Sequence, residues 1–182
     1  MTLANKITMA RILLVPFFVT CFIYYSPEAD FLRYIALVIF AVSVMTDAVD
    51  GYVARKYYQK TKLGTALDPI ADKLLLVSAY ISLTLTNTLP ASSRLPPWVT
   101  VVVISRDVLI VLGTMMLHML MGKIEIRPNI LGKITTALQM FTVIVVLLGY
   151  KYSYIIWITT VIFTVLSGLA YLIRANRLQN VS

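Results

Sequence analysis

Long apolar stretches without charged residues recur along this chain, and they constrain its fold more than any other feature. The clearest of them covers residues 152–173. Hydrophobic residues make up 59% of the 182 residues and charged residues only 13%, whereas a soluble domain of ordinary composition has about 25% charged residues. We therefore expect an all-α integral membrane protein, since an α-helix satisfies its own backbone hydrogen bonds in lipid.

The apolar stretches predict six transmembrane helices in one bundle, which form a single domain over residues 1–182. The second stretch has only 13 uncharged residues, Tyr34–Thr46, fewer than the ~20 that a crossing helix needs. Its helix should therefore continue beyond the membrane surface into the charged segment that follows. The expected spans cover residues 7–25, 31–45, 70–88, 98–121, 134–150 and 152–173.

The distribution of basic residues predicts the orientation. With six spans, twelve of the 16 Lys and Arg residues fall on the side that carries both termini and the second and fourth connecting segments. Only Arg33, Arg94 and Lys151 fall on the other side, and Arg106 lies within a span. The positive-inside rule makes the more basic side cytoplasmic. Basic residues around a membrane protein reflect topology and attraction to anionic lipid, so we expect no nucleic-acid partner.

Four aspartates between residues 47 and 72 account for half of the eight acidic residues. A carboxylate facing lipid would cost about 2.5–3.5 kcal/mol. Asp47 and Asp50 are three residues apart and Asp68 and Asp72 are four apart, so each pair shares one face of a helix. Two facing helices would bring the four carboxylates together, and an all-oxygen ligand set suits Mg²⁺ or Mn²⁺. For one pair alone, an ion-paired helix end is the alternative interpretation.

Small and basic residues near these aspartates, and one arginine elsewhere, are further candidates. A glycine inside a helix costs about 1 kcal/mol relative to alanine, so Gly51 and Gly64 indicate close approach of a ligand or a facing helix. Arg55 suits a phosphate or the membrane surface. Arg106 in mid-span should face a cavity or a partner rather than lipid. Its neighbour Asp107 points about 100° away on a helix and is not an automatic partner.

The residues from Asp50 to Asp72 read Asp-Gly-x2-Ala-Arg-x8-Gly-x3-Asp-x3-Asp, with Asp47 three residues upstream. With this signature the chain closely resembles the CDP-alcohol phosphatidyltransferases, membrane enzymes that build phospholipid head groups. The resemblance covers nearly the whole chain. It extends to Asn5-x2-Thr8-x2-Arg11, to Ser105-Arg106-Asp107 and to Gly132-Lys133-Ile134-Thr135-Thr136.

The resemblance implies transfer of the phosphatidyl group of CDP-diacylglycerol to an alcohol, with release of CMP and with Mg²⁺ or Mn²⁺. It implies an active site at the cytoplasmic face of a bacterial inner or plasma membrane, contact with membrane lipids, and a homodimer as a candidate assembly. Asp47, Asp50 and Asp68 correspond to metal ligands, and Asp72 to either the last ligand or the general base. The residues assigned to CDP binding are Asp50, Gly51, Ala54, Arg55, Thr61, Gly64 and Asp68. Those assigned to the acceptor or a lipid phosphate are Arg106, Lys133, Asn5 and Arg11.

Two acceptor alcohols fit the resemblance. The short six-span chain and the Asn-x2-Thr-x2-Arg pattern resemble members that use glycerol 3-phosphate. Bacterial members of that kind tend to carry a second arginine eight positions after the one in the fourth span, where this chain has Thr114. The stretch 104–110 instead resembles members that use phosphatidylglycerol and make cardiolipin. We favour glycerol 3-phosphate and keep phosphatidylglycerol as the alternative.

A third hypothesis is a non-enzymatic membrane protein, such as a cation channel or scaffold, with the carboxylates as an ion site. It predicts acidic residues along a path across the bilayer. The four aspartates instead cluster at one predicted face, and the first, fifth and sixth spans hold no acidic residue. The distribution therefore favours the enzyme.

Overall fold

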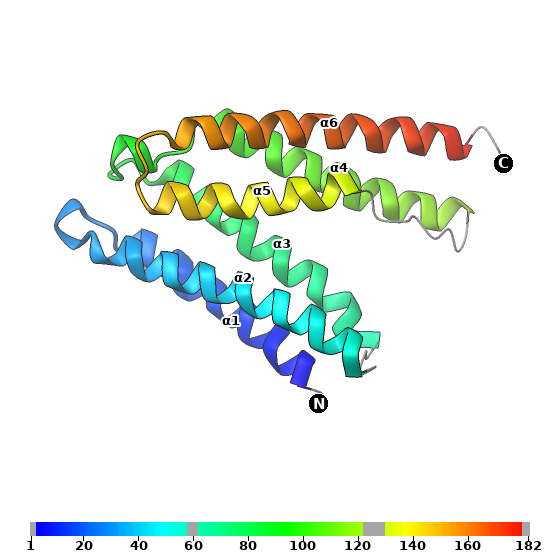
Figure 1. Cartoon of the computed structure of the whole chain (residues 1–182), viewed down its shortest axis with the longest axis horizontal. Helices are drawn as coiled ribbons and strands as arrows, with labels where there is room; N and C mark the ends of the chain where they lie inside the picture. Colours follow the sequence, from blue (N-terminus) through cyan, green and yellow to red (C-terminus); the bar gives the residue numbers. More distant parts are fainter. Residues whose placement is uncertain (1–2, 58–61, 122–129, 180–182) are drawn as a thin grey trace. The chain divides into compact units, whose positions relative to one another are not determined.

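A computed structural model describes residues 3–57, 62–121 and 130–179, and the side chains of residues 9–46, 73–91, 93–116 and 130–174 among them (Figure 1). These residues form six α-helices and two 3₁₀ turns, with no β-strand in the described ranges. The helices are α1 (Leu3–Ile23), α2 (Phe31–Tyr57), α3 (Lys62–Leu85), α4 (Pro97–Met121), α5 (Ile130–Leu147) and α6 (Ser153–Gln179), and the turns are η1 (Pro27–Ala29) and η2 (Ala91–Ser93).

Each predicted apolar stretch forms one of these helices. The expectation that the second helix continues past its apolar part is confirmed, because α2 runs unbroken to Tyr57. The largest difference is in α3, which begins at Lys62 rather than near residue 70. The predicted boundary was placed where the apolar residues begin, but helical hydrogen bonding continues through the polar residues before them. All four motif aspartates therefore lie in helices.

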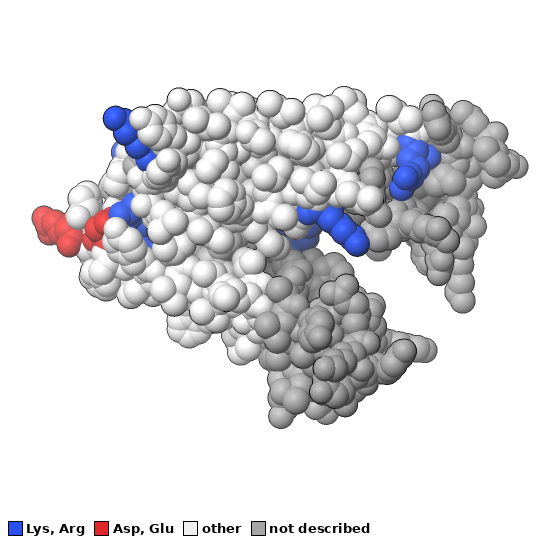
Figure 2. Space-filling view, viewed as in Figure 1, with Lys and Arg blue, Asp and Glu red and all other residues white. Residues whose placement is uncertain are grey.

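Three helical segments are long and apolar enough to cross a membrane: Pro97–Met116, Ile130–Leu147 and Ser153–Arg174. Shorter apolar segments occur in the other three helices, at Met9–Ile23, Phe31–Thr46 and Lys73–Leu85. Many large apolar side chains on these helices are exposed, and wide areas of the visible surface carry no charge (white in Figure 2). These features are those of a helical membrane protein.

The chain divides into two compact units. Unit 1 comprises Met1–Leu95 and Val143–Lys151, and unit 2 comprises Pro96–Thr142 and Tyr152–Ser182. The division falls within α5, so the last residues of that helix belong to unit 1 although the rest of it belongs to unit 2.

In unit 1, α1 packs against both α2 and α3. Phe18 of α1 is fully buried, and its ring lies 5.1 Å from that of Phe22 and 6.0 Å from that of Phe40 on α2. Tyr80 and Leu83 of α3 are fully buried as well. Burial of side chains of this size contributes about 1.5–3 kcal/mol each. Packing against α1 therefore stabilises both helices that carry the aspartate motif.

Arg33 joins three connecting segments of unit 1. Its side chain donates to Asp30 at 2.8 Å and to Ser93 Oγ at 3.0 Å, and Tyr25 donates to Asp30 at 2.9 Å. Gly149 has a φ of +71°, and a Cβ atom there would collide with Arg33 Nη1. The Arg33 guanidinium holds the pKa of Asp30 below its ordinary value of 3.8. We call these five residues the Arg33 cluster.

In unit 2, α4 packs against α6. Trp98 and Trp157 meet edge to face at 5.5 Å. Hydrogen bonds join α5 to α6: Thr142 and Thr160 share one of 2.7 Å, and Thr135 Oγ1 donates to the Phe163 carbonyl at 3.2 Å. Hydrogen bonds of this kind stabilise helix association in lipid.

Candidate active site

The four motif aspartates lie on α2 and α3 at matching heights above the connection between these helices. Asp50 is seven residues before the end of α2 and Asp68 is six residues after the start of α3. At a rise of ~1.5 Å per residue, they stand about 10 and 9 Å from their helix ends. Asp47 and Asp72 are each ten residues from those ends, or about 15 Å.

The two helix ends lie close together because the connection is short. From Tyr57 to Lys62 there are five chain steps, which span at most about 18 Å. Figure 1 shows the C-terminal end of α2, the N-terminal end of α3 and the N-terminal end of α1 at the same end of unit 1. The helix backbones thus carry the two aspartate pairs at similar levels of this end. The side chains of residues 47–72 lie outside the described part of the structure.

The other predicted residues of unit 1 are placed by their helices. Gly51, Ala54 and Arg55 lie in α2 and Gly64 in α3, whereas Thr61 lies outside the described residues. Asn5 and Arg11 lie in the first part of α1. Their side chains differ in what the structure describes: that of Arg11 is buried, and that of Asn5 is outside the described part.

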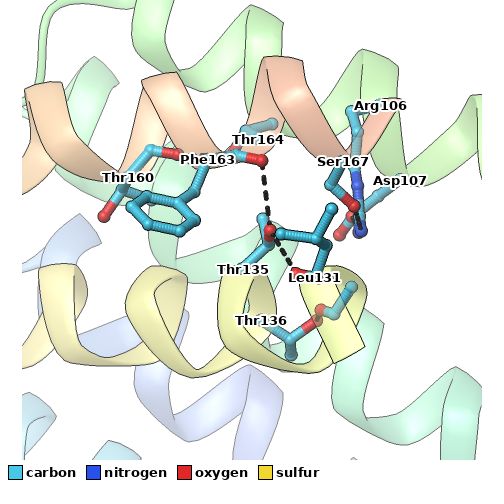
Figure 3. A network of polar contacts seen from close by, with 10 residues as sticks. Arg106, Asp107, Leu131, Thr135, Thr136, Thr160, Phe163, Thr164 and Ser167 are labelled. Carbon is cyan, nitrogen blue, oxygen red and sulfur yellow. Dashed lines mark hydrogen bonds and ion pairs between the residues drawn. The ribbon is translucent and has the colours of Figure 1, made fainter. Parts of the chain in front are cut away.

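Unit 2 contains a polar cluster around Arg106 on α4, shown in Figure 3. Arg106 Nη1 lies 2.8 Å from Asp107 Oδ1, and Arg106 Nη2 donates to Ser167 Oγ on α6 at 2.5 Å. The exposed fractions of the Arg106 and Asp107 side chains are 9% and 5%. The charge pair is therefore removed from lipid and water. The expectation that Arg106 faces a partner is confirmed.

The sequence left open whether Asp107 pairs with Arg106, and the structure shows that it does. Neighbouring residues on a helix diverge by about 100°, but the arginine side chain is long enough to bring its guanidinium back to the adjacent carboxylate. Burial favours the pairing, because a buried arginine without a counter-charge is costly.

Two glycines make room for the arginine side chain. A Cβ atom at Gly132 on α5 would lie 3.4 Å from Arg106 Nη2, and one at Gly168 on α6 would lie 3.6 Å from Arg106 Cγ. The first of these distances is at the lower limit of an ordinary contact, so a residue larger than alanine at position 132 would press on the guanidinium. Lys133, the next residue of α5, is exposed.

Further along α4, Thr114 Oγ1 lies 3.3 Å from the Tyr171 hydroxyl of α6. Gly113 permits this approach, since a Cβ atom there would lie 2.6 Å from the same hydroxyl. Thr114 and Tyr171 are thus a neutral hydroxyl pair at the position where the resemblance led us to look for a second arginine.

Sequence reasoning missed Ser167 and Tyr171. Ser167 and Gly168 are small residues in the second half of the uncharged stretch 152–173, and a small polar residue in such a stretch is a signal of helix–helix contact. The sequence did not show which helix Ser167 would contact. Tyr171 carried no signal beyond its amphipathic ring.

Residues 1–166 match the family described as CDP-alcohol phosphatidyltransferase. The chain belongs to this family and is therefore a phosphatidyltransferase of phospholipid biosynthesis, as the aspartate signature indicated. Enzymes of this family generally depend on divalent metal ions.

The chain is similar along most of its length to relatives with two kinds of name. A probable phosphatidylglycerophosphate synthase of Mycobacterium tuberculosis (strain H37Rv) is 32% identical over 181 residues, 96% of this chain and 82% of that protein. The CDP-diacylglycerol–glycerol-3-phosphate 3-phosphatidyltransferase of Bacillus subtilis is 34% identical over 186 residues, 93% of this chain and 92% of that one. The CMP-forming cardiolipin synthase of Rattus norvegicus is 32% identical over 193 residues, 93% of this chain and 60% of that enzyme.

The donors of the aspartate motif fit a divalent metal. Carboxylates are hard oxygen donors of the kind that Mg²⁺ and Mn²⁺ prefer, and α2 and α3 each carry two of them in this motif. Among the residues whose side chains are described, no group of three or more His, Cys, Asp or Glu residues offers a competing site.

Proposed function

We propose that this protein transfers the phosphatidyl group of CDP-diacylglycerol to glycerol 3-phosphate, which gives phosphatidylglycerophosphate and CMP. The observation that carries this proposal is the similarity to the Bacillus subtilis enzyme, which covers 93% of this chain and 92% of that protein. The similarity to the rat cardiolipin synthase covers only 60% of the rat enzyme.

The aspartates of α2 and α3 are the proposed metal ligands. A bound Mg²⁺ or Mn²⁺ would neutralise the charge that develops on the pyrophosphate as CMP leaves. Asp47, Asp50 and Asp68 would hold the ion, and Asp72 would either complete the ligand set or take the proton of the attacking hydroxyl. Gly51, Ala54 and Gly64 leave room for the nucleotide, and Arg55 and Thr61 contact its phosphates.

Arg106 and Lys133 are the residues proposed to bind the phosphate of glycerol 3-phosphate. Arg106 pairs with only one carboxylate among the described residues, and its Nε–H is buried there with no acceptor. Lys133 follows Gly132, whose backbone lies against Arg106 Nη2. A cation on α4 and another at the start of α5 suit a doubly charged phosphomonoester. Asn5 and Arg11 remain candidates for contact with a lipid phosphate.

The proposed topology has six crossings, with both termini and the aspartate motif on the cytoplasmic side. The charge asymmetry supports it, because twelve of the 16 basic residues fall on that side. The N-terminal end of α1 lies at the same end of unit 1 as the C-terminal end of α2 and the N-terminal end of α3 (Figure 1), and this placement is consistent with the topology.

The test is release of CMP by the purified enzyme from CDP-diacylglycerol in the presence of Mg²⁺. Glycerol 3-phosphate should start the release, and a chelator should stop it. Asp50→Asn and Asp68→Asn should each lower turnover by at least about 10³-fold, because the loss affects transition-state charge. Near-normal turnover in either variant would remove that residue from the metal site.

A second candidate is cardiolipin synthesis with phosphatidylglycerol as the acceptor. The Thr114–Tyr171 hydroxyl pair favours it, because a neutral pair binds a phosphomonoester less well than an arginine does. Release of CMP on addition of phosphatidylglycerol, with none on addition of glycerol 3-phosphate, would establish this second function in place of the first.

A further inference from the structure

Ser167 of α6 contacts Arg106, and the proposed chemistry of the aspartates does not explain this contact. Ser167 is buried, with an exposed fraction of 3%, and it is the only described residue of α6 that bonds to Arg106. Its hydroxyl accepts a hydrogen bond from Arg106 Nη2 (Figure 3). Two other buried hydroxyls of α6, those of Thr160 and Thr164, each bond to a backbone carbonyl, and Thr160 also shares a hydrogen bond with Thr142.

The Arg106 guanidinium is oriented but not saturated. It has five N–H groups. In the described part of the chain, one at Nη1 donates to Asp107, one at Nη2 donates to Ser167, and the buried Nε–H has no acceptor. Asp107 supplies the charge balance, whereas Ser167 fixes the opposite terminal nitrogen. With both terminal nitrogens held, the plane of the guanidinium cannot rotate freely.

The backbone around Ser167 reinforces this restriction. Gly168 follows Ser167 and lies against Arg106 Cγ, and Gly132 lies against Nη2. The side chain is therefore enclosed by α5 and α6 along its length, and Ser167 is the polar contact at its tip.

We propose that Ser167 is a positioning residue for the acceptor phosphate, and that it acts by fixing the orientation of Arg106. This inference rests on the proposed function, since it takes Arg106 to bind the phosphate of glycerol 3-phosphate. A planar guanidinium binds a phosphate well in only a few orientations. Removal of the serine hydroxyl should therefore weaken acceptor binding although Arg106 itself remains.

The test is the kinetics of Ser167→Ala, with CMP release followed while each substrate is varied. The apparent KM for glycerol 3-phosphate should rise about 10-fold, the effect of a lost hydrogen bond to a charged group. The KM for CDP-diacylglycerol should change by less than about 2-fold. Ser167→Thr keeps the hydroxyl and should restore most of the acceptor affinity. Thr164→Val is the matched control, because it removes a buried hydroxyl one turn away that bonds within α6.

A double-mutant cycle tests whether Ser167 acts through Arg106. In an Arg106→Lys background the Nη2 atom is absent, so Ser167→Ala should have little additional effect on the KM for glycerol 3-phosphate. A further 10-fold increase in that background would overturn the proposal.

The remaining outcomes separate this inference from the proposed function. A wild-type enzyme without CMP release on glycerol 3-phosphate overturns both. A wild-type enzyme that uses glycerol 3-phosphate, with an unchanged KM in Ser167→Ala, overturns only the role of Ser167. Equal increases in both KM values, or the same increase in Thr164→Val, would make Ser167 structural and overturn the role as well.

Discussion

Burial should decide how much each of two aspartates contributes to stability, because both lie at the same distance from an arginine. Asp107 lies 2.8 Å from Arg106, and Asp30 lies 2.8 Å from Arg33. The Asp107 side chain is 5% exposed and that of Asp30 is 38% exposed. Asparagine at either position keeps the shape and one acceptor oxygen but removes the charge. The two substitutions therefore compare a buried pair with a partly solvated one.

Asp107→Asn leaves a buried cation without its counter-charge. Loss of one partner of a buried pair costs about 3–5 kcal/mol, and the retained amide acceptor favours the lower end. For a chain of this length, ~1 kcal/mol corresponds to a change in Tm of about 2–4 °C, so Tm should fall by about 6–12 °C. Asp30→Asn should cost about 1 kcal/mol or less, because water screens that pair, with a fall in Tm below about 4 °C.

The measurement is thermal unfolding of the purified protein in detergent, followed by tryptophan fluorescence. Trp98 and Trp157 form an edge-to-face pair in unit 2, and these are the only two tryptophans of the chain, so the signal comes from the unit that contains Arg106. Removal of both charges in Arg106→Leu/Asp107→Asn should restore much of the lost stability. A fall of less than about 3 °C for Asp107→Asn, or an equal fall for both single variants, would refute the burial argument.

Three other predictions concern the Arg33 cluster and the topology. Gly149→Ala should lower the free energy of unfolding by about 1–2 kcal/mol, because the residue has a positive φ and a methyl group would meet Arg33; no change in thermal unfolding would contradict the left-handed conformation at this position. The stability difference between wild type and Asp30→Asn should be constant at pH values above 3.8, the ordinary pKa of Asp30. It should disappear as pH falls through the lower pKa of Asp30 in the folded protein, because protonation removes the attraction to Arg33. A difference that persists at lower pH would contradict this. In a Cys21→Ala background, single cysteines at Thr88 and Arg174, which are exposed, should react with an impermeant reagent from opposite sides of the membrane; reaction from one side only would refute six crossings.

The sequence predicted the helices well because each apolar stretch ends at charged or turn-forming residues. It predicted the ends less well where a helix continues into polar residues, since the apolar pattern stops there and the backbone hydrogen bonds do not. The start of α3 at Lys62 shows this difference most clearly.

The candidate site was predictable to the extent that its residues are close in sequence. The aspartate spacing within α2 and within α3 could be read directly, and the helices confirm that each pair lies in one helix. Contacts between distant segments could not be derived in this way. Ser167 and Arg106 are 61 residues apart, and only helix packing determines that they meet. The sequence left the Arg106–Asp107 pair open, because the Cα–Cβ bonds of neighbouring helical residues diverge and only the length of the arginine side chain lets the two charges meet.

Unit 1 combines the first half of the chain with the later segment Val143–Lys151, and this has a consequence for biosynthesis. Arg33 contacts Gly149, which is 116 residues later in the chain (149 − 33). At a synthesis rate of ~5–20 residues per second, roughly 6–23 s separate the two residues at the ribosome. During that interval α1, α2 and α3 can associate, but the segment Val143–Lys151 that completes their unit has not yet emerged. The first half of the protein is therefore synthesised with one of its contacts unmade, and that contact can form only after most of the second half has been synthesised.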